Sequence, residues 1–133
     1  MEVYEIEYEE VEFKEAKREK RGGKSVLIAR FIDDYEDEIE FDATALKCEH
    51  LIAYLNKETT PLAIGSIDEQ PITLKTPQFV ECTVAQATPA ANTRGTHKVT
   101  LDNGRQVQLP KHVKQGDRVI MRLPVEEFSQ KIV

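Results

Sequence analysis

Several features common in proteins are scarce in this chain, and each scarcity narrows the class of protein. Among its 133 residues there is no tryptophan, and the only cysteines are Cys48 and Cys82. Two cysteines are too few for a disulfide framework and fit no metal motif, so we expect reduced thiols packed as small hydrophobic side chains. No run approaches the roughly 20 apolar residues of a membrane helix, and the N-terminus lacks the basic start of a signal peptide. We therefore expect a cytoplasmic protein without membrane contact.

Motifs that support catalysis are also missing. The sequence has no P-loop glycine pattern, no nucleophile elbow and no cluster of metal ligands at the usual spacing. Cys48 and His50 lie two positions apart, too close to share one face of a helix as ligands. Acidic residues are abundant, yet abundance alone does not place two carboxylates across a cleft. We expect a protein that is not an enzyme and needs no cofactor or metal.

Short stretches of alternating apolar and polar residues make up most of the chain, which is typical of strands with one buried face. In the C-terminal part, apolar residues alternate from Val99 to Leu109 on both sides of Asp102-Asn103-Gly104, whose residues tolerate the positive φ of a tight hairpin turn. Near the N-terminus the alternation changes phase at Glu9-Glu10, which indicates a β-bulge. Further strands are expected over residues 25–32, 39–41, 62–67, 72–74 and 78–87.

One segment has a helical period instead. Between Ala43 and Leu55, apolar residues recur at the spacing of one face of a short helix. Asp42 or Thr44 is placed to cap its first turn by accepting a backbone N–H bond. Many short strands with a single helix favour small β-barrels over a parallel sheet.

Charge is distributed unevenly along the chain. Residues 1–75 contain 10 basic and 19 acidic side chains, a net charge of −9, whereas residues 76–133 contain 8 basic and 5 acidic side chains, a net charge of +3. This contrast predicts two domains that face different partners. A polyanion would be attracted only to the second half. The acidic first half is a candidate surface for a protein partner or for self-association.

Two charged segments in the first half each allow two interpretations. The basic stretch from Lys14 to Lys24, around Gly22-Gly23, is either a hairpin with a solvated tip or a loop that binds phosphate, and it has no aromatic residue to stack on bases. The acidic stretch from Asp33 to Glu38 is either an exposed turn or a Ca²⁺ site, although it lacks the EF-hand spacing. In both cases the solvated surface is the favoured interpretation.

The order of these features resembles the middle and C-terminal domains of bacterial elongation factor P. The run from Lys98 to Val119 has comparable residues at comparable places, namely Gly104, Val107, Pro110, Gly116, Asp117 and Val119. Upstream, Leu55 to Pro77 is similar to the closing hairpin of the family's middle domain, and Val125 to Phe128 resembles its final turn. The resemblance implies a mainly all-β fold of two small OB-like β-barrels in tandem with one short helix. The acidic barrel would span residues 1–75 and the mildly basic barrel residues 76–133.

Membership of this family would imply a non-catalytic protein that binds the ribosome and tRNA. Such a protein touches phosphate backbone through Arg and Lys on the exposed face of a rigid barrel. The candidate contacts are the basic residues of the second half, Arg94, Lys98, Arg105, Lys111, Lys114, Arg118 and Arg122. His97 and His112 would add charge when they are protonated.

Two departures from the family pattern support a competing hypothesis. The family's first domain carries a lysine that reaches the peptidyl-transferase centre, and nothing upstream of Val3 corresponds to that domain. The chain is then expected to be a truncated piece, a paralogue without the domain, or a relative with another task. The loop at residues 90–96 also lacks the family's Gly-Asp-Thr motif. The competing hypothesis is a protein-interaction or assembly module that keeps the barrels but not the role in translation.

Overall fold

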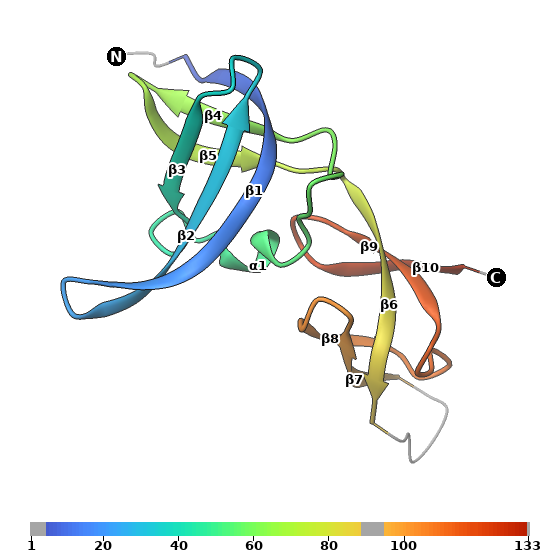
Figure 1. Ribbon diagram of the computed structural model, residues 1–133. Helices are drawn as coiled ribbons and strands as arrows, with labels where there is room; N and C mark the ends of the chain where they lie inside the picture. Colours follow the sequence, from blue (N-terminus) through green and yellow to red (C-terminus); the bar gives the residue numbers. More distant parts are fainter. Residues whose placement is uncertain (1–4, 89–94, 133) are drawn as a thin grey trace. The chain divides into compact units, whose positions relative to one another are not determined.

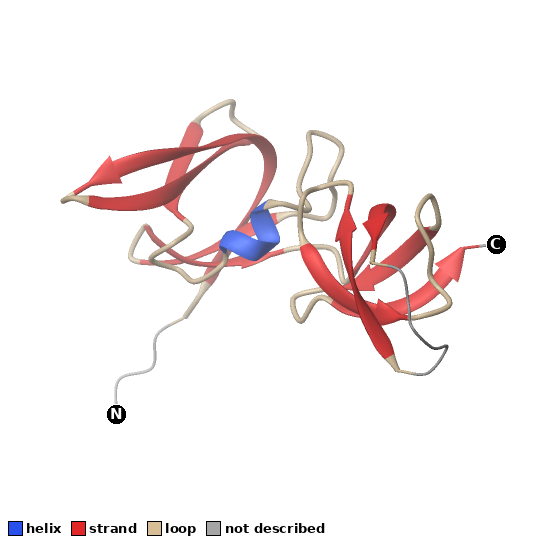
Figure 2. Ribbon diagram, turned by 90° about the horizontal axis from the view of Figure 1, so that it is seen from below, coloured by secondary structure: helices blue, strands red, loops and turns tan. Residues whose placement is uncertain are grey.

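Ten strands and one short helix form the regular structure of residues 5–88 and 95–132, the part of the chain that the computed structural model describes. The strands belong to two compact units, Met1–Pro77 (unit one) and Gln78–Val133 (unit two), each with a five-stranded antiparallel sheet. Figure 2 shows how little helix accompanies the strands. The expected fold class, all-β with two small OB-like barrels and one short helix, is confirmed. Within these residues no helix has the length and apolar character of a membrane span.

Unit one is built around its first strand. β1 (Glu7–Arg21) pairs with β4 (Ala63–Ile67) through its first four residues and with β2 (Lys24–Asp33) from Val11 onward. Because one long strand serves two neighbours in succession, the sheet curls, and its strand order is β3-β2-β1-β4-β5 (Figure 1). The remaining elements are β3 (Glu38–Asp42), α1 (Glu49–Ile52) and β5 (Gln70–Lys75).

Aromatic and aliphatic side chains fill the inside of this curled sheet. Phe31 on β2 is fully buried, stacks on Phe41 with 5.2 Å between ring centroids, and meets the edge of Phe13 at 5.7 Å. Ile28 and Ile64 are also buried. Burial of one such side chain contributes about 1.5–3 kcal/mol. The aromatic cluster therefore ties β1, β2 and β3 together.

The bulge in β1 lies further along the strand than the sequence suggests. The pairing of β1 with β2 shifts register between Phe13 and Glu15, whereas Glu9 and Glu10 pair regularly with β4. The change of alternation at Glu9-Glu10 marks the point at which β1 leaves β4, since pairing with β2 begins at Val11. A change of partner strand and a bulge can each change which alternate positions of a strand are apolar. The sequence pattern therefore does not distinguish between them.

The helix is shorter than expected. Residues 43–47 form turns, and only Glu49–Ile52 are helical. Asp42 Oδ1 accepts hydrogen bonds from the backbone N–H groups two and three residues later, so Asp42 caps the turn and not the helix. Thr44 Oγ1 instead accepts a hydrogen bond from a backbone N–H of β2. Lys47 then has a φ of 57°, outside the right-handed helical region, and this residue stops the helix from starting earlier.

Unit two repeats this strand order, with its first strand again in the middle and the second and fourth strands on either side (Figure 1). The first strand, β6, pairs with β9 through Phe79–Thr83 and with β7 through Val84–Ala87. The strands are β6 (Phe79–Ala87), β7 (Thr96–Leu101), β8 (Gln106–Pro110), β9 (Arg118–Arg122) and β10 (Glu127–Ile132).

The hairpin that joins β7 to β8 agrees with the sequence in both its turn and its core. Gly104 has a φ of 87° in the turn, and Asn103 Oδ1 accepts a hydrogen bond from the backbone N–H of Arg105. The alternating apolar side chains all point inward and are buried, namely Val99, Leu101, Val107 and Leu109. Alternation is a reliable guide here because one face of this hairpin is covered and the other meets solvent.

Candidate nucleic-acid interface

The basic residues predicted to contact RNA are distributed over three parts of unit two. Arg94 lies outside the described residues. Lys98, Lys111 and Lys114 are near the start of β7, Arg105 follows the β7–β8 turn, and Arg118 and Arg122 lie on β9. The surroundings of each group decide how much positive charge it presents.

The three lysines lie where the loop after β8 meets the start of β7. The backbone N–H of Lys111 donates to the carbonyl of the residue before β7, at 3.3 Å. The carbonyl of Val113, in the same loop, lies 2.9 Å from His97 Nε2 on β7. These contacts bring the loop that carries Lys111 and Lys114 close to the strand that carries Lys98. Lys98 and Lys114 are exposed and form no salt bridge with any residue that the structure describes.

Two backbone carbonyls face the ring of His97. Nδ1 lies 2.9 Å from the Thr88 oxygen, and Nε2 lies 2.9 Å from the Val113 oxygen. Carbonyl oxygens only accept, and a neutral imidazole has one N–H, so only the protonated ring donates to both. The side chain therefore joins the end of β6 and the β8–β9 loop to β7.

Arg105 is held by a carboxylate. Its Nε lies 2.7 Å from Glu126 Oε1 and its Nη2 lies 2.8 Å from Glu126 Oε2, which is a bidentate pair. The side chain of Glu126 is 15% exposed and that of Arg105 is 36% exposed. This pair connects the β7–β8 turn with the turn between β9 and β10. Its geometry and partial burial give Arg105 a structural part in unit two.

Both arginines of β9 face carboxylates on the neighbouring strands. Arg118 binds Glu81 of β6, and Arg122 binds Glu127 of β10. The four side chains are about half exposed. Such surface pairs contribute only about 0–1 kcal/mol, so an incoming phosphate can replace either carboxylate. Until it does, the glutamates cancel the charge of the arginines.

One exposed aromatic side chain beside these arginines escaped the sequence analysis. Phe79 is 51% exposed and is paired with Arg122 across β6 and β9. An exposed ring next to a guanidinium group is suited to stacking on a nucleobase. The signal was present in the sequence, since the inward alternation of Val80, Cys82 and Val84 leaves Phe79 on the outer face.

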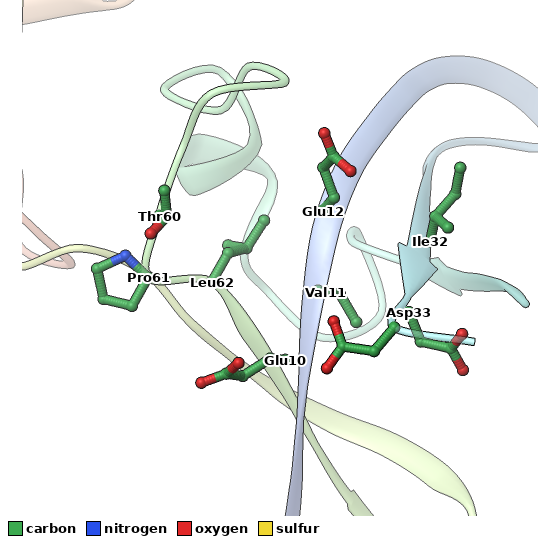
Figure 3. A pocket seen from close by; sticks show the side chains of 9 residues that line it. Glu10, Val11, Glu12, Ile32, Asp33, Thr60, Pro61 and Leu62 are labelled. Carbon is green, nitrogen blue, oxygen red and sulfur yellow. The ribbon is translucent and has the colours of Figure 1, made fainter. Parts of the chain in front are cut away.

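In unit one a hollow of about 210 Å³ opens beside β1 (Figure 3). It is lined by Glu10, Val11, Glu12, Ile32, Asp33, Asp34, Thr60, Pro61 and Leu62. Although several of these residues are acidic, Figure 3 shows Glu10 and Glu12 pointing away from each other. No three carboxylate, histidine or cysteine side chains of the described residues are placed to hold a metal ion. The acidic stretch between β2 and β3 forms an exposed turn.

A pair of carboxyl groups lies next to this hollow. The hydrogen bond to Asp33 raises the pKa of Glu9, and the loss of solvation and the nearby aspartates act in the same direction. For Asp33, partial burial opposes ionisation, but hydrogen bonds from the N–H of Asp37, from Glu9 and from the N–H of Tyr35 outweigh it and lower its pKa. When Glu9 carries its proton, it can donate to the ionised Asp33, which itself accepts the hydrogen bonds that shape the turn.

Comparison with known proteins matches both units, and unit two most clearly. Residues 80–131 match the family model described as "Elongation factor P, C-terminal". An elongation factor P from Leptospira biflexa is 30% identical over 110 residues, which cover 80% of this chain and 56% of that protein. An elongation factor P-like protein from a Marinomonas species is 26% identical over 100 residues, or 72% of this chain and 53% of that protein. This chain spans about half the length of the curated relatives that it matches.

Proposed function

Because this chain belongs to the elongation factor P family, we propose that it is a non-catalytic translation factor that binds the ribosome and tRNA in the cytoplasm. The observation that carries the proposal is the family match over residues 80–131. That stretch contains all seven candidate contacts, namely Arg94, which lies outside the described residues, and Lys98, Arg105, Lys111, Lys114, Arg118 and Arg122. In this proposal, unit one corresponds to the family's middle domain.

The proposed contacts are made to phosphate and not to base edges. The exposed face of unit two offers lysines and arginines on strands and short loops, which can position phosphate groups but carry no sequence information. Lys98 and Lys114 are ready to bind, while Arg118 and Arg122 must first exchange their glutamates for phosphate. We assign Arg105 mainly to the stability of the unit because of its bond to Glu126.

The test is co-sedimentation of the full chain with purified ribosomes at low salt. The variant Lys98→Gln/Lys114→Gln removes two charges that form no salt bridge with a described residue. We expect its bound fraction to fall several-fold because two phosphate contacts are lost, and its salt slope to fall by about 1 for each contact. The matched control is Lys47→Gln/Lys57→Gln, which removes the same charge from exposed positions of unit one. Equal binding by both variants, or no binding by the wild-type chain, would remove the proposal.

A second candidate function is suggested by the surface of unit one. Ile6 and Tyr8 are 41% and 48% exposed, and the Tyr8 ring carries Lys75 Nζ at 4.1 Å from its centroid. An acidic unit with exposed apolar side chains suits a protein partner or self-association. Tyr8→Ser would then weaken a complex that ribonuclease treatment leaves intact, whereas loss of the complex on ribonuclease treatment would favour the translation proposal.

A further inference from the structure

The hairpin of β1 and β2 extends beyond the rest of unit one. Its last pairs join Arg18 to Leu27, Glu19 to Val26, Lys20 to Ser25 and Arg21 to Lys24. β4 pairs with β1 only near the start of that strand, and β3 pairs with β2 only from Ile28 onward. The end of the hairpin is therefore a two-stranded ribbon, and Figure 1 shows it projecting from the curled sheet.

The tip of this ribbon, residues 17–24, carries the opposite charge to its unit. It contains five basic side chains and one acidic side chain, a net charge of +4, within residues 1–75 whose net charge is −9. Because neighbouring strand residues point to opposite faces, Lys20 lies on one face of the ribbon and Lys24, across from Arg21, on the other. Both faces of the tip are thus positive.

Lys20 and Lys24 are the least neutralised charges of the tip, because its arginines are paired with glutamates. Arg18 forms a salt bridge with Glu49, and Arg21 binds both Glu19 and Glu40. The bond from Arg21 is the main reason why the pKa of Glu40 is lowered, and Arg30 adds to it. By contrast, Lys20 and Lys24 are exposed and form no salt bridge with any residue in the described ranges.

The turn itself leaves the tip accessible. Gly22 and Gly23 have φ values of 58° and 80°, the left-handed pair that a two-residue hairpin turn requires. A Cβ atom on either glycine would meet nothing within 4 Å, so no described residue of unit one covers the turn.

We propose that the tip of the β1–β2 hairpin is a second polyanion-binding site, which contacts the phosphate backbone of folded RNA. Positive charge on both faces suits a narrow ribbon that enters between two backbone strands. The absence of aromatic residues from residues 17–24 restricts the contact to phosphate and excludes base stacking. An anionic membrane is the weaker partner, because the tip has no apolar residue to bury in a lipid surface.

This site goes beyond the surface of unit two and does not depend on it. It reverses the expectation that only the second half attracts a polyanion, since charge summed over residues 1–75 hides a local cluster of the other sign. Isolated RNA is therefore the probe for the hairpin site. A chain that fails to bind ribosomes can then be distinguished from a chain whose hairpin fails to bind RNA.

The experiment measures binding of the full chain to a short fluorescent RNA duplex between about 50 and 200 mM salt. For Lys20→Gln/Lys24→Gln, we expect the slope of log K against log salt to become shallower by about 1.8. The ratio of wild-type to variant affinity for the RNA then falls about tenfold between the lowest and the highest salt concentration. Lys47→Gln/Lys57→Gln is the control with the same change in charge.

Two further variants separate charge from folding. Lys20→Arg/Lys24→Arg retains the charge and should keep wild-type affinity. Glu19→Gln removes one of the carboxylates that hold Arg21 and should tighten binding about threefold, a change that damage to the fold would not produce. The proposal is overturned if the Lys20/Lys24 variant keeps the wild-type slope or matches the control. It is also overturned if that variant loses binding only to phosphatidylserine vesicles and not to RNA.

Discussion

Arg105 and Glu126 form two parallel hydrogen bonds, of 2.7 Å and 2.8 Å, between turns that lie 21 residues apart in sequence. Glu126 is the more buried partner, so loss of the arginine leaves a carboxylate with little solvation. We expect Arg105→Met to lower the free energy of unfolding by about 1–3 kcal/mol. In a double-mutant cycle with Glu126→Gln, measured by urea denaturation, the coupling should be about 1–2 kcal/mol.

The control for this cycle is the exposed pair Arg122 and Glu127. Because both side chains are about half exposed, their coupling should stay below about 0.5 kcal/mol. A coupling for Arg105 and Glu126 as small as this would contradict a structural role for Arg105.

His97 should matter more for stability than its place among surface residues suggests. His97→Ala leaves the carbonyls of Thr88 and Val113 without their ring partner, and we expect a loss of about 1–2 kcal/mol in the free energy of unfolding. His112 is exposed and makes a T-shaped ring contact with Phe128, with 6.2 Å between the ring centroids, so His112→Ala should cost less. The free energies of unfolding of the two variants are compared by thermal or urea denaturation. Equal losses would contradict the role of His97 in joining β7 to its neighbours.

The hydrogen bond between Glu9 and Asp33 makes stability depend on pH. The pKa of Glu9 is raised above its ordinary value of 4.5, so the stabilisation from its bound proton is full below 4.5 and is lost as pH rises through the raised pKa. The pKa of Asp33 is lowered below 3.8, so its contribution is present above 3.8 and is lost as pH falls through the lowered pKa.

Glu9→Gln separates these two effects, because the amide still donates to Asp33 but cannot ionise. We expect this variant to be more stable than the wild-type chain at pH 7 and to lose that advantage toward pH 4. Melting temperatures across this range check the sign. An advantage that grows as the pH falls would contradict the assigned proton.

The two thiols should be inert while the protein is folded. Burial is the largest cause of a pKa of about 11 for Cys48 and about 12 for Cys82, and nearby carboxylates act in the same direction. Thiolate is the reactive form, so iodoacetamide at pH 8 should label neither cysteine until denaturant unfolds the chain. Labelling of either thiol at the rate of a free cysteine would contradict the packing of its unit.

Local turn chemistry is what made much of the fold predictable from sequence. Asn103-Gly104 and Gly22-Gly23 tolerate positive φ by themselves, and alternation alone placed Leu101 and Leu109 in the core. The helix was overestimated because nothing in the apolar spacing reveals the left-handed conformation of Lys47. The spacing of apolar residues does not predict a local backbone conformation that depends on tertiary contacts.

The candidate interface was less predictable than the fold for a related reason. Arg118 binds Glu81 from 37 positions away, and only the register of β6 against β9 brings them together. The list of basic residues therefore overstated the free positive charge of unit two, and the summed charge of residues 1–75 concealed that of the hairpin tip in unit one. Ion pairing across strands depends on register, which a list of charged residues does not contain.

Titration of purified ribosomes with the fluorescently labelled full chain, at low salt and then at rising salt, tests the assignment to translation. We predict saturable binding that weakens steadily as salt increases, because the contacts are made to phosphate. Absence of saturable binding at low salt, or binding that is insensitive to salt, would contradict it.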